Sequence, residues 1–386
     1  MTPDTHAVRS TRTCSRCVMD DSDPAITFDE QGVCNHCLNF EQNIKPHWHI
    51  GPEGQAHLER KIRQIKHEQS HREYDCIIGL SGGVDSSYLA IKAVELGLRP
   101  LVVHVDAGWN SELAVQNIER LVTKLKLDLH TIVIDWEEMR DLQVAFLRAG
   151  VPNQDIPQDH AYFAALYRFA IKHRVRWVLS GENIASESIM PLAWGFNAMD
   201  SRHLRAIHRQ FGSRPLKSFP LVAIIHLYFL FPFVHRMRVL RPLNYLPFDK
   251  QAAKEILMRD YDWKDYGAKH HESVWTKFFQ GYYLPTRFGF DKRKAHLSSL
   301  IVSGQLSRET AVLELQKPAY PAEDLRRDRA YVLKKLGLTE ADFVSLLRQP
   351  PRSHANYPSH AKLLGLIRTM ARRLPINHWI RAIFKA

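Results

Sequence analysis

Short apolar runs alternate with helical patterns between residues 73 and about 185. Four runs rich in aliphatic residues predict buried strands, at 75–80, 101–106, 128–134 and 177–180. The stretches between them carry apolar residues at helical spacing and predict helices at 86–96, 111–124 and 158–173. This alternation indicates a parallel sheet with helices on both faces. We therefore predict an α/β fold built on a doubly wound parallel sheet.

The most apolar stretch of the chain lies outside that pattern, at 220–234. It is too short to span a bilayer and contains His226 and Pro232, so a buried helix or an interfacial hairpin is favoured over membrane contact. In the tail, at 368–385, basic residues alternate with apolar ones. This tail is either an amphipathic helix on a membrane or partner, or a terminal helix packed on its own domain.

The chain has 386 residues, which is enough for two or three domains with their own cores. We expect a small N-terminal module over 1–50, an α/β domain over 51–265 and a mostly helical region over 266–386. The formal net charge of +12 suits an anionic partner such as a nucleotide, a nucleic acid or a membrane surface. Residues 1–13 have no apolar core, so no signal peptide is predicted and the expected location is cytoplasmic.

Four of the five cysteines form two tight pairs. Cys14 and Cys17 make one CxxC pair, Cys34 and Cys37 make another, and sixteen residues separate the pairs. This spacing is typical of a structural four-sulfur zinc site, whose metal supplies folding free energy to a segment with little core of its own. Disulfides would require an oxidising compartment, and a redox pair is usually a single CxxC in a βαβ unit. The fifth cysteine, Cys76, lies in an apolar run and is predicted to be buried.

A loop rich in glycine and serine follows the first predicted strand and leads into the first helix. A strand, a glycine-containing turn and a helix N-terminus together favour anion binding, because backbone N–H groups point outward and the helix dipole attracts negative charge. Glycine lets the backbone approach a phosphate closely, and serine adds hydroxyl donors. An aspartate in such a loop fits if Mg²⁺ bridges it to the phosphates. The loop comprises Ser81, Gly82, Gly83, Val84, Asp85, Ser86 and Ser87.

This segment resembles the PP-loop of the ATP pyrophosphatases, which carries an SGGxDS signature. The resemblance implies cleavage of ATP between the α- and β-phosphates and transfer of AMP to an oxygen of the substrate. No Gly-Lys-Ser or Gly-Lys-Thr follows, so the segment is not a Walker loop. Two further strand ends should face the same crevice. One carries Asp106, which the resemblance places by the adenosine, and the other carries Gly181 and Glu182, with Glu182 a candidate metal or substrate ligand.

Two segments in the C-terminal part, 266–280 and 285–305, are dense in polar and charged side chains. Together with the CxxC pairs, the PP-loop and the motifs at 104–112, 181–183 and 247–250, they resemble the N-acetyl sugar amidotransferases, the LPS biosynthesis protein WbpG family. The resemblance runs from about Cys14 to Tyr320. It implies conversion of an acetamido group on a nucleotide-linked sugar into an acetamidino group, in the synthesis of bacterial LPS O-antigen or another surface polysaccharide.

The implied reaction must overcome the poor leaving-group character of an amide oxygen. AMP transfer to that oxygen makes it a good leaving group, after which ammonia attacks the carbon and AMP departs. The site then needs a pyrophosphate cradle, Mg²⁺, cations near the developing phosphate charge and exclusion of water. Asp85 is the first candidate for a Mg²⁺ ligand, and Lys292 or Arg293 for the α-phosphate. Candidates for sugar binding or proton transfer are Lys269, His270, His271 and Glu272.

The source of ammonia is not evident in this chain. Position 2 is threonine, and no Cys–His–Glu glutaminase pattern remains once four cysteines are assigned to a metal. We therefore expect a separate glutaminase with a channel partner, and the family resemblance points to subunits similar to the two halves of imidazole glycerol phosphate synthase.

The alternative function is that of a tRNA-modifying PP-loop enzyme of the 2-thiolation type. Such enzymes also adenylate a carbonyl-type oxygen, and many have CxxC pairs and a basic surface. They usually need reactive cysteines or an iron–sulfur cluster near the PP-loop, and here only Cys76 is unassigned. No aromatic and basic RNA platform is evident, so a nucleic-acid partner is not expected. A zinc-knuckle binding protein without catalysis would leave the PP-loop unexplained.

Overall fold

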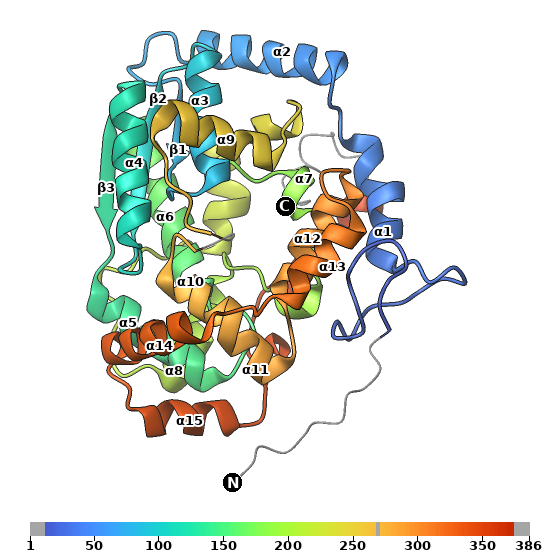
Figure 1. Ribbon diagram of the computed structural model, residues 1–386. Helices are drawn as coiled ribbons and strands as arrows, with labels where there is room; N and C mark the ends of the chain where they lie inside the picture. The colour runs from blue at the N-terminus through green and yellow to red at the C-terminus, as the bar shows by residue number, and fades with distance from the viewer. Residues whose placement is uncertain (1–11, 268–270, 374–386) are drawn as a thin grey trace.

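The computed structural model describes residues 12–267 and 271–373 of the chain. Within these residues, five strands form one parallel sheet in the order β3-β2-β1-β4-β5 (Figure 1). The strands are β1 (Cys76–Gly79), β2 (Pro100–Asp106), β3 (Leu129–Val133), β4 (Trp177–Leu179) and β5 (Arg238–Leu240). In the central pairings, Ile77 is opposite Leu101 of β2 and Val178 of β4.

Helices connect and cover these strands. The helices before β5 are α1 (Asn35–Asn39), α2 (Pro52–Glu68), α3 (Val84–Glu95), α4 (Glu112–Leu125), α5 (Trp136–Ala149), α6 (Ile156–Lys172), α7 (Ile184–Glu187), α8 (Ser201–Phe211) and the π-helix η4 (His226–Val234). Those after β5 are α9 (Lys250–Tyr261), α10 (Val274–Phe278), α11 (Leu284–Phe288), α12 (Lys292–Val302), α13 (Arg308–Gln316), α14 (Ala322–Leu336), α15 (Glu340–Arg348) and α16 (Ala361–Arg373).

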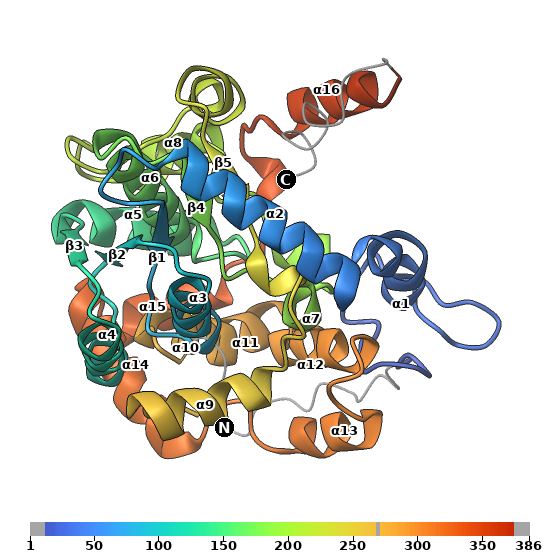
Figure 2. The ribbon, with the colours of Figure 1, turned by 90° about the horizontal axis from the view of Figure 1, so that it is seen from above.

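Both faces of the sheet are buried, because alternate strand residues point to opposite sides. Ile77 and Val103 pack in one core with residues of α5, α6 and α8. Ile78 and Val102 pack in a second core with residues of α2, α3, α4 and α9. Figure 2 shows α5 and α6 on one side of the strands and α3 and α4 on the other. The predicted doubly wound α/β class is therefore confirmed.

Two smaller cores extend the fold beyond the sheet. In one, Trp109 from the loop after β2 stacks on Trp275 of α10, with ring centroids 5.5 Å apart, and residues of α14 and α15 complete the cluster. In the other, the N-terminal cysteines pack against Trp194 and Ala295. The core around the cysteines contains residues from both sides of position 50, and the core around Trp109 contains residues from both sides of position 265. The domain boundaries expected at 50 and 265 therefore stay predictions.

The four predicted strands and three predicted helices are present with ends shifted by one or two residues. The strand β5 was not predicted, because Arg238 and Val239 are exposed and leave no apolar run to recognise. Residues 25–28, between the two cysteine pairs, have the composition of a short strand but do not form one, since only Phe28 pairs, in an isolated bridge with Cys34. The carboxylate of Asp23 accepts a hydrogen bond from the amide of Ala25 and bends this segment into a turn instead.

The apolar stretch 220–234 contains a helix, as expected, but only part of it is buried. Phe231 of η4 enters the core beside α6, while Ile225, Phe229 and Val234 remain about half exposed. Among the described helices, none combines the length and the apolar character that crossing a bilayer requires.

Candidate nucleotide site and metal centre

The predicted PP-loop is a tight turn between β1 and α3. Gly82 has φ of +82°, and a Cβ atom there would lie 2.7 Å from the carbonyl oxygen of Ala114, so only glycine fits. The indole N–H of Trp263 donates to the Gly82 carbonyl at 3.1 Å. The turn is thus fixed from α4 on one side and from the segment after α9 on the other.

Hydroxyl groups hold the backbone amides of this loop in place. The amide of Ser81 donates to Ser86 Oγ at 3.3 Å, and the amide of Gly83 donates to Ser81 Oγ at 3.3 Å. The amide of Val84, the first residue of α3, donates to the hydroxyl of Tyr266 at 3.2 Å. Amides and hydroxyls therefore gather at the N-terminus of a twelve-residue helix, where an anion is favoured.

A cavity of about 330 Å³ opens beside this turn. The PP-loop, α6, the ends of β4 and β5, α7 and the segment before α10 form its walls. The polar and charged residues that line it are Ser81, Asp85, Ser86, Asp159, Tyr162, Tyr167, Ser180, Glu182, Glu187, Arg241, Lys250, Tyr266 and Glu272. Five predicted loop residues thus line the cavity together with Gly181 and Glu182 from the end of β4: Ser81, Gly83, Val84, Asp85 and Ser86.

Asp85 combines one paired and one unpaired carboxylate oxygen. Its Oδ2 lies 3.6 Å from the ammonium group of Lys250, whereas its Oδ1 is buried and has no hydrogen-bond partner within the described chain. A Cβ atom on Gly181 would lie 3.1 Å from the carbonyl carbon of Asp85, so a side chain at this position would push against the backbone of α3. A carboxylate oxygen without a donor fits a hard cation such as Mg²⁺.

Three other predicted residues lie around the loop but outside the cavity lining. Ser87 is fully buried, and Gly82 uses its carbonyl to hold Trp263. Asp106 ends β2 and accepts hydrogen bonds from the amide of Gly108 at 2.8 Å and from Asn110 Nδ2 at 3.0 Å. Asp106 therefore orders the turn after β2, and its expected place by the adenosine stays a prediction.

Carboxyl groups line the wall opposite the PP-loop. Glu182 forms an ion pair with Arg241 at 2.7 Å. Burial, together with repulsion from Asp155, raises the pKa of Asp159 to about 8. Asp159 was not singled out from the sequence, because its place in the cavity depends on how α6 packs. The available signal was a carboxylate four residues after Asp155 at the start of an otherwise apolar helix.

The C-terminal candidates separate into different environments. Glu272 lines the cavity, and its Oε1 lies 3.2 Å from the position of a Cβ atom on Gly83. Lys292 begins α12, with its ammonium group 5.6 Å from the ring centroid of Phe279, and its charge acts on Asp159. Arg293 instead binds the carboxylate of Asp291 at 2.7 Å and the carbonyl of Lys317 at 2.8 Å. Lys269 and His270 lie outside the described residues.

The four cysteines of the N-terminal module form a closed cluster. Their sulfur atoms lie within 4.8 Å of one another, and all four residues are buried. The amides of Arg16 and Cys17 donate to Cys14 Sγ at 3.4 Å, and the amide of Cys34 donates to the same sulfur at 3.2 Å. These donors favour thiolates, and four sulfur ligands without an open position fit a structural metal ion. His36 pairs with Asp23 at 2.7 Å and is not part of the cluster.

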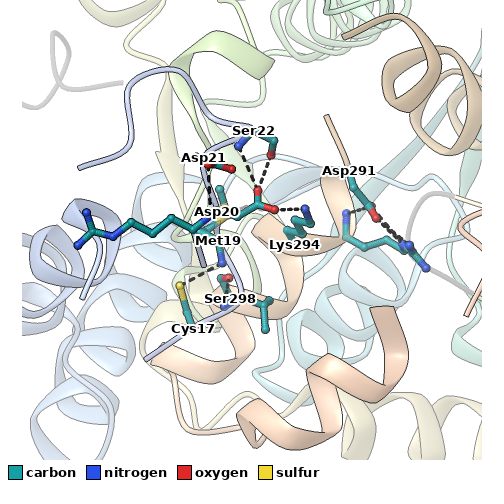
Figure 3. Close-up of polar contacts among 11 residues, drawn as sticks. Cys17, Met19, Asp20, Asp21, Ser22, Asp291, Lys294 and Ser298 are labelled. Carbon is teal, nitrogen blue, oxygen red and sulfur yellow. Dashed lines mark hydrogen bonds and ion pairs between the residues drawn. The ribbon is translucent and has the colours of Figure 1, made fainter. Parts of the chain in front are cut away.

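The cysteine module is bound to one side of α12, as Figure 3 shows. The amide of Val18 donates to Ser298 Oγ at 3.2 Å, and Lys294 forms an ion pair with the carboxylate of Asp20, a buried residue. From α13, the guanidinium group of Arg308 donates to the carbonyls of Cys17 and Cys14 at 3.1 and 3.2 Å. The cysteine cluster and the helix that begins with Lys292 are therefore held as one unit.

The other side of α12 is bound to the cavity wall. Ser299 Oγ accepts a hydrogen bond from the amide of Ile189 at 2.9 Å, and Ser303 donates to the carbonyl of Ala185 at 2.9 Å. Ala185 belongs to α7, whose last residue, Glu187, lines the cavity. The helix α12 thus links the cysteine cluster to the wall of the cavity.

Solved structures with similarity to this chain cover different shares of it. An NH3-dependent NAD synthetase from Campylobacter jejuni has 17% identity and a TM-score of 0.27, covering 35% of this chain and 59% of that chain. An NMN synthetase from Francisella tularensis has 16% identity and a TM-score of 0.27, covering 55% and 93%. The U34-tRNA thiolase NcsA from Methanococcus maripaludis, with its [4Fe-4S] cluster, has 12% identity and a TM-score of 0.33, covering 79% and 89%.

Sequence relatives complete the comparison. A protein of Methanocaldococcus jannaschii, described as uncharacterized, is 23% identical over 330 residues, which is 81% of this chain and 98% of that protein. Residues 272–372 match the family described as LPS biosynthesis protein WbpG-like, C-terminal domain. The match begins at Glu272, on the cavity wall, and includes the whole of α12. The resemblance to the WbpG family is thereby confirmed over residues 272–372, and the first residue of this match, Glu272, lines the same cavity as the loop residues Ser81 and Asp85.

Proposed function

We propose that this chain is an ATP-dependent amidotransferase that converts an acetamido group of a nucleotide-linked sugar into an acetamidino group. One observation carries the proposal. The PP-loop and Glu272 line the same cavity, and Glu272 is the first residue of the WbpG-like match. A loop that would activate ATP therefore lies beside a domain whose family is described by LPS biosynthesis. The activity therefore belongs to synthesis of a bacterial surface polysaccharide such as the LPS O-antigen.

The loop residues would bind the phosphates of ATP. The amides of Ser81, Gly83 and Val84 donate to the hydroxyls of Ser86, Ser81 and Tyr266, and these hydroxyls would donate in turn to phosphate oxygens at the N-terminus of α3. Asp85 would hold Mg²⁺, which when bound neutralises charge on the departing pyrophosphate. Lys292, the first residue of α12, acts electrostatically on Asp159 in the cavity wall and would stabilise charge at the α-phosphate.

The carboxyl wall would serve the second half of the reaction. The amide oxygen first attacks the α-phosphorus and pyrophosphate leaves, which gives an adenylated imidate. Ammonia then forms the new C–N bond, AMP leaves with the former amide oxygen, and the nitrogen must lose a proton. Asp159 lines the cavity, and its pKa of about 8 suits a group that takes up this proton in mildly alkaline solution, where the carboxylate is ionised. Glu272, on the PP-loop side, would orient the acetamido group.

Two supporting parts complete the proposal. The cysteine cluster would hold zinc in a structural role, since its four sulfurs are closed off by protein. Ammonia would come from a separate glutaminase with a channel subunit, similar to the two halves of imidazole glycerol phosphate synthase. All five cysteines of the chain are buried, and four belong to the cluster, so none is placed to act as a glutaminase nucleophile.

A sulfur-transfer function is the alternative. It would need a reactive thiol beside the PP-loop, yet Cys76 is fully buried within β1 and burial raises its pKa well above the usual range for a thiol. A thiol in that state is a poor nucleophile. Thiolation would therefore have to use the N-terminal cluster, as an iron–sulfur centre rather than a zinc site.

The decisive experiment is a product analysis. Purified protein is incubated with Mg-ATP, ammonium and UDP-linked acetamido sugars, and the products are analysed by mass spectrometry. Formation of AMP and pyrophosphate with a loss of one mass unit from the sugar is the expected result, because an oxygen is replaced by an NH group. Release of ADP, or turnover that requires tRNA, would contradict the proposal.

A further inference from the structure

An exposed apolar surface lies on the side of the molecule that carries η4. Ile225, Phe229 and Val234 are 55%, 54% and 57% exposed, and Phe229 contacts the ring of Phe233 at 5.7 Å between centroids. The residues are four or five positions apart and share one face of the π-helix region. A contiguous exposed patch of large apolar side chains usually marks a surface that binds a partner or a membrane.

The sequence around this patch has a pronounced charge bias. Residues 201–248 contain eight Arg and Lys residues and no Asp or Glu. Three of the eight pair with acids elsewhere: Arg214 with Glu137, Arg238 with Glu68 and Arg241 with Glu182. The other five are exposed, and no ion pair with an acid is found for them in the described part of the chain: Arg202, Arg205, Arg209, Lys217 and Arg236.

The fold brings these basic residues to the side of the apolar patch. Arg202, Arg205 and Arg209 recur at helical spacing along α8, whose buried residues Leu204 and Ile207 pack in the same core as Phe231 of η4. Arg236 follows η4 directly. The segment that contains η4 connects α8 to β5 along the chain. In Figure 2, α8 and β5 lie on the side of the molecule toward which α16 projects.

We propose that this face, formed by the outer sides of α8 and η4, docks the protein on an anionic lipid bilayer. Large apolar side chains flanked by arginines, in a segment of chain that contains no Asp or Glu, match the boundary between acyl chains and negatively charged headgroups. The helix lies on the surface rather than crossing it, since no described helix is long and apolar enough to cross. The proposal does not depend on the amide chemistry, because the cavity residues lie outside this face.

The test is binding of the full-length protein to vesicles, measured by cosedimentation. We expect binding to vesicles containing phosphatidylglycerol and much weaker binding to pure phosphatidylcholine. The double variant Ile225→Asp/Phe229→Asp should bind about tenfold more weakly or worse. The matched control is Val312→Asp/Leu313→Asp on α13, where two exposed apolar residues receive the same charges on a different face, and it should bind like the parent. Melting temperatures check that both variants fold.

A second variant tests the charged part of the surface. Arg202→Gln/Arg205→Gln/Arg209→Gln should weaken binding by roughly fivefold for each arginine that lies near the headgroups, with a smaller dependence on salt. Equal binding to neutral and anionic vesicles, or unchanged binding of the Ile225/Phe229 double variant, would overturn the proposal. So would a protein that ignores vesicles but forms a dimer that this double variant abolishes, because the face would then be an interface between copies.

Discussion

The PP-loop and the cysteine cluster are both short motifs that bring polar groups together, yet the fold treats them in opposite ways. The loop opens on a cavity of about 330 Å³, and one carboxylate oxygen of Asp85 is left without a hydrogen-bond partner in the described chain. The cluster is closed, with four buried sulfurs and backbone amides directed at them. An open motif can accept a substrate, whereas a closed one can only hold what stabilises it.

The two motifs are connected through α12. The cysteine module binds one side of this helix through Ser298 and Asp20, and the cavity wall binds the other through Ser299 and Ser303. The closed motif thus contributes to the chemistry by position, since it fixes the helix that begins with Lys292. This difference predicts that changes at the loop reduce activity without unfolding, and that changes at the cluster reduce stability first.

The largest effect is expected at the open motif. Asp85→Asn removes the charge that would hold Mg²⁺ while keeping the shape of the side chain. AMP formation should fall by about 1000-fold, because a preorganised electrostatic contact to the departing pyrophosphate is lost. The melting temperature should change by only a few degrees, or rise, since the substitution removes a negative charge whose Oδ1 has no hydrogen-bond partner in the described chain. An Asn variant that retains more than a tenth of the activity would exclude Asp85 as the metal ligand.

The closed motif should respond mainly in stability. Cys14→Ser removes the sulfur that receives three backbone N–H groups, and we expect loss of the bound metal and a drop of several kcal/mol in the free energy of unfolding. Elemental analysis and thermal melting measure both. Ser15→Ala, in the same turn but outside the cluster, is the control and should keep the metal.

The same measurement distinguishes the two possible metals. One equivalent of zinc per chain supports the structural role, whereas iron with visible absorption would favour the sulfur-transfer alternative. Full metal retention in Cys14→Ser would contradict the four-sulfur assignment altogether.

Neighbouring cations on α12 test whether the helix serves the cavity. Lys292→Met should lower the rate of AMP formation by about 100-fold, because Lys292 acts on the cavity carboxylate Asp159. Arg293→Met is the matched control. Its guanidinium group binds Asp291 and the Lys317 carbonyl, so its loss should cost about 1 kcal/mol of stability and little activity. The reverse pattern would mean that α12 turns a different side to the substrate.

The sequence predicted those parts of the fold that depend on local pattern. The strands β1 to β4 and the helices α3, α4 and α6 were found because each buried run is bounded by polar turns. The β5 strand was missed, since an edge strand with two exposed residues carries no apolar run. For the apolar stretch 220–234 the sequence left a buried helix and an interfacial hairpin open, and the structure has a helix with one exposed face, because exposure depends on which neighbours cover it.

The residues of the candidate site also fall into two groups, those that local sequence predicts and those that packing places. The loop residues and the four cysteines could be named from spacing, because their geometry is set within a few residues of chain. Asp159 could not, because only the packing of α6 against β1 and β4 brings it to the cavity. Arg293 looked like Lys292 in sequence, and the difference between them arises from the cap at Asp291. Long-range packing therefore decided which polar residues share a site.

The smallest effect that we expect is on the pH dependence of stability. It comes from three histidines that, like the cysteines, are buried within the protein. Burial lowers the pKa of His160 and His203 to about 4 and that of His354 to about 3, and His354 also accepts a hydrogen bond from the amide of Asn153. The unfolded chain, with histidine pKa values near 6.5, binds more protons than the folded one below that pH. Stability should therefore be full above pH 7 and fall as the pH drops toward 4.

The loss of stability at low pH distinguishes the buried histidines from polar groups that face solvent or the cavity. By pH 5 each buried histidine should have cost on the order of 1–2 kcal/mol, measurable as a falling midpoint in urea titrations. His203→Phe should remove about a third of this pH dependence, whereas His71→Asn, at an exposed position, should leave it unchanged. The activity should instead change around pH 8, because Asp159 faces the cavity with a pKa of about 8. If stability and activity lost their pH dependence together in His203→Phe, the cavity and the histidine core would be coupled, and the contrast between open and closed polar groups would not hold.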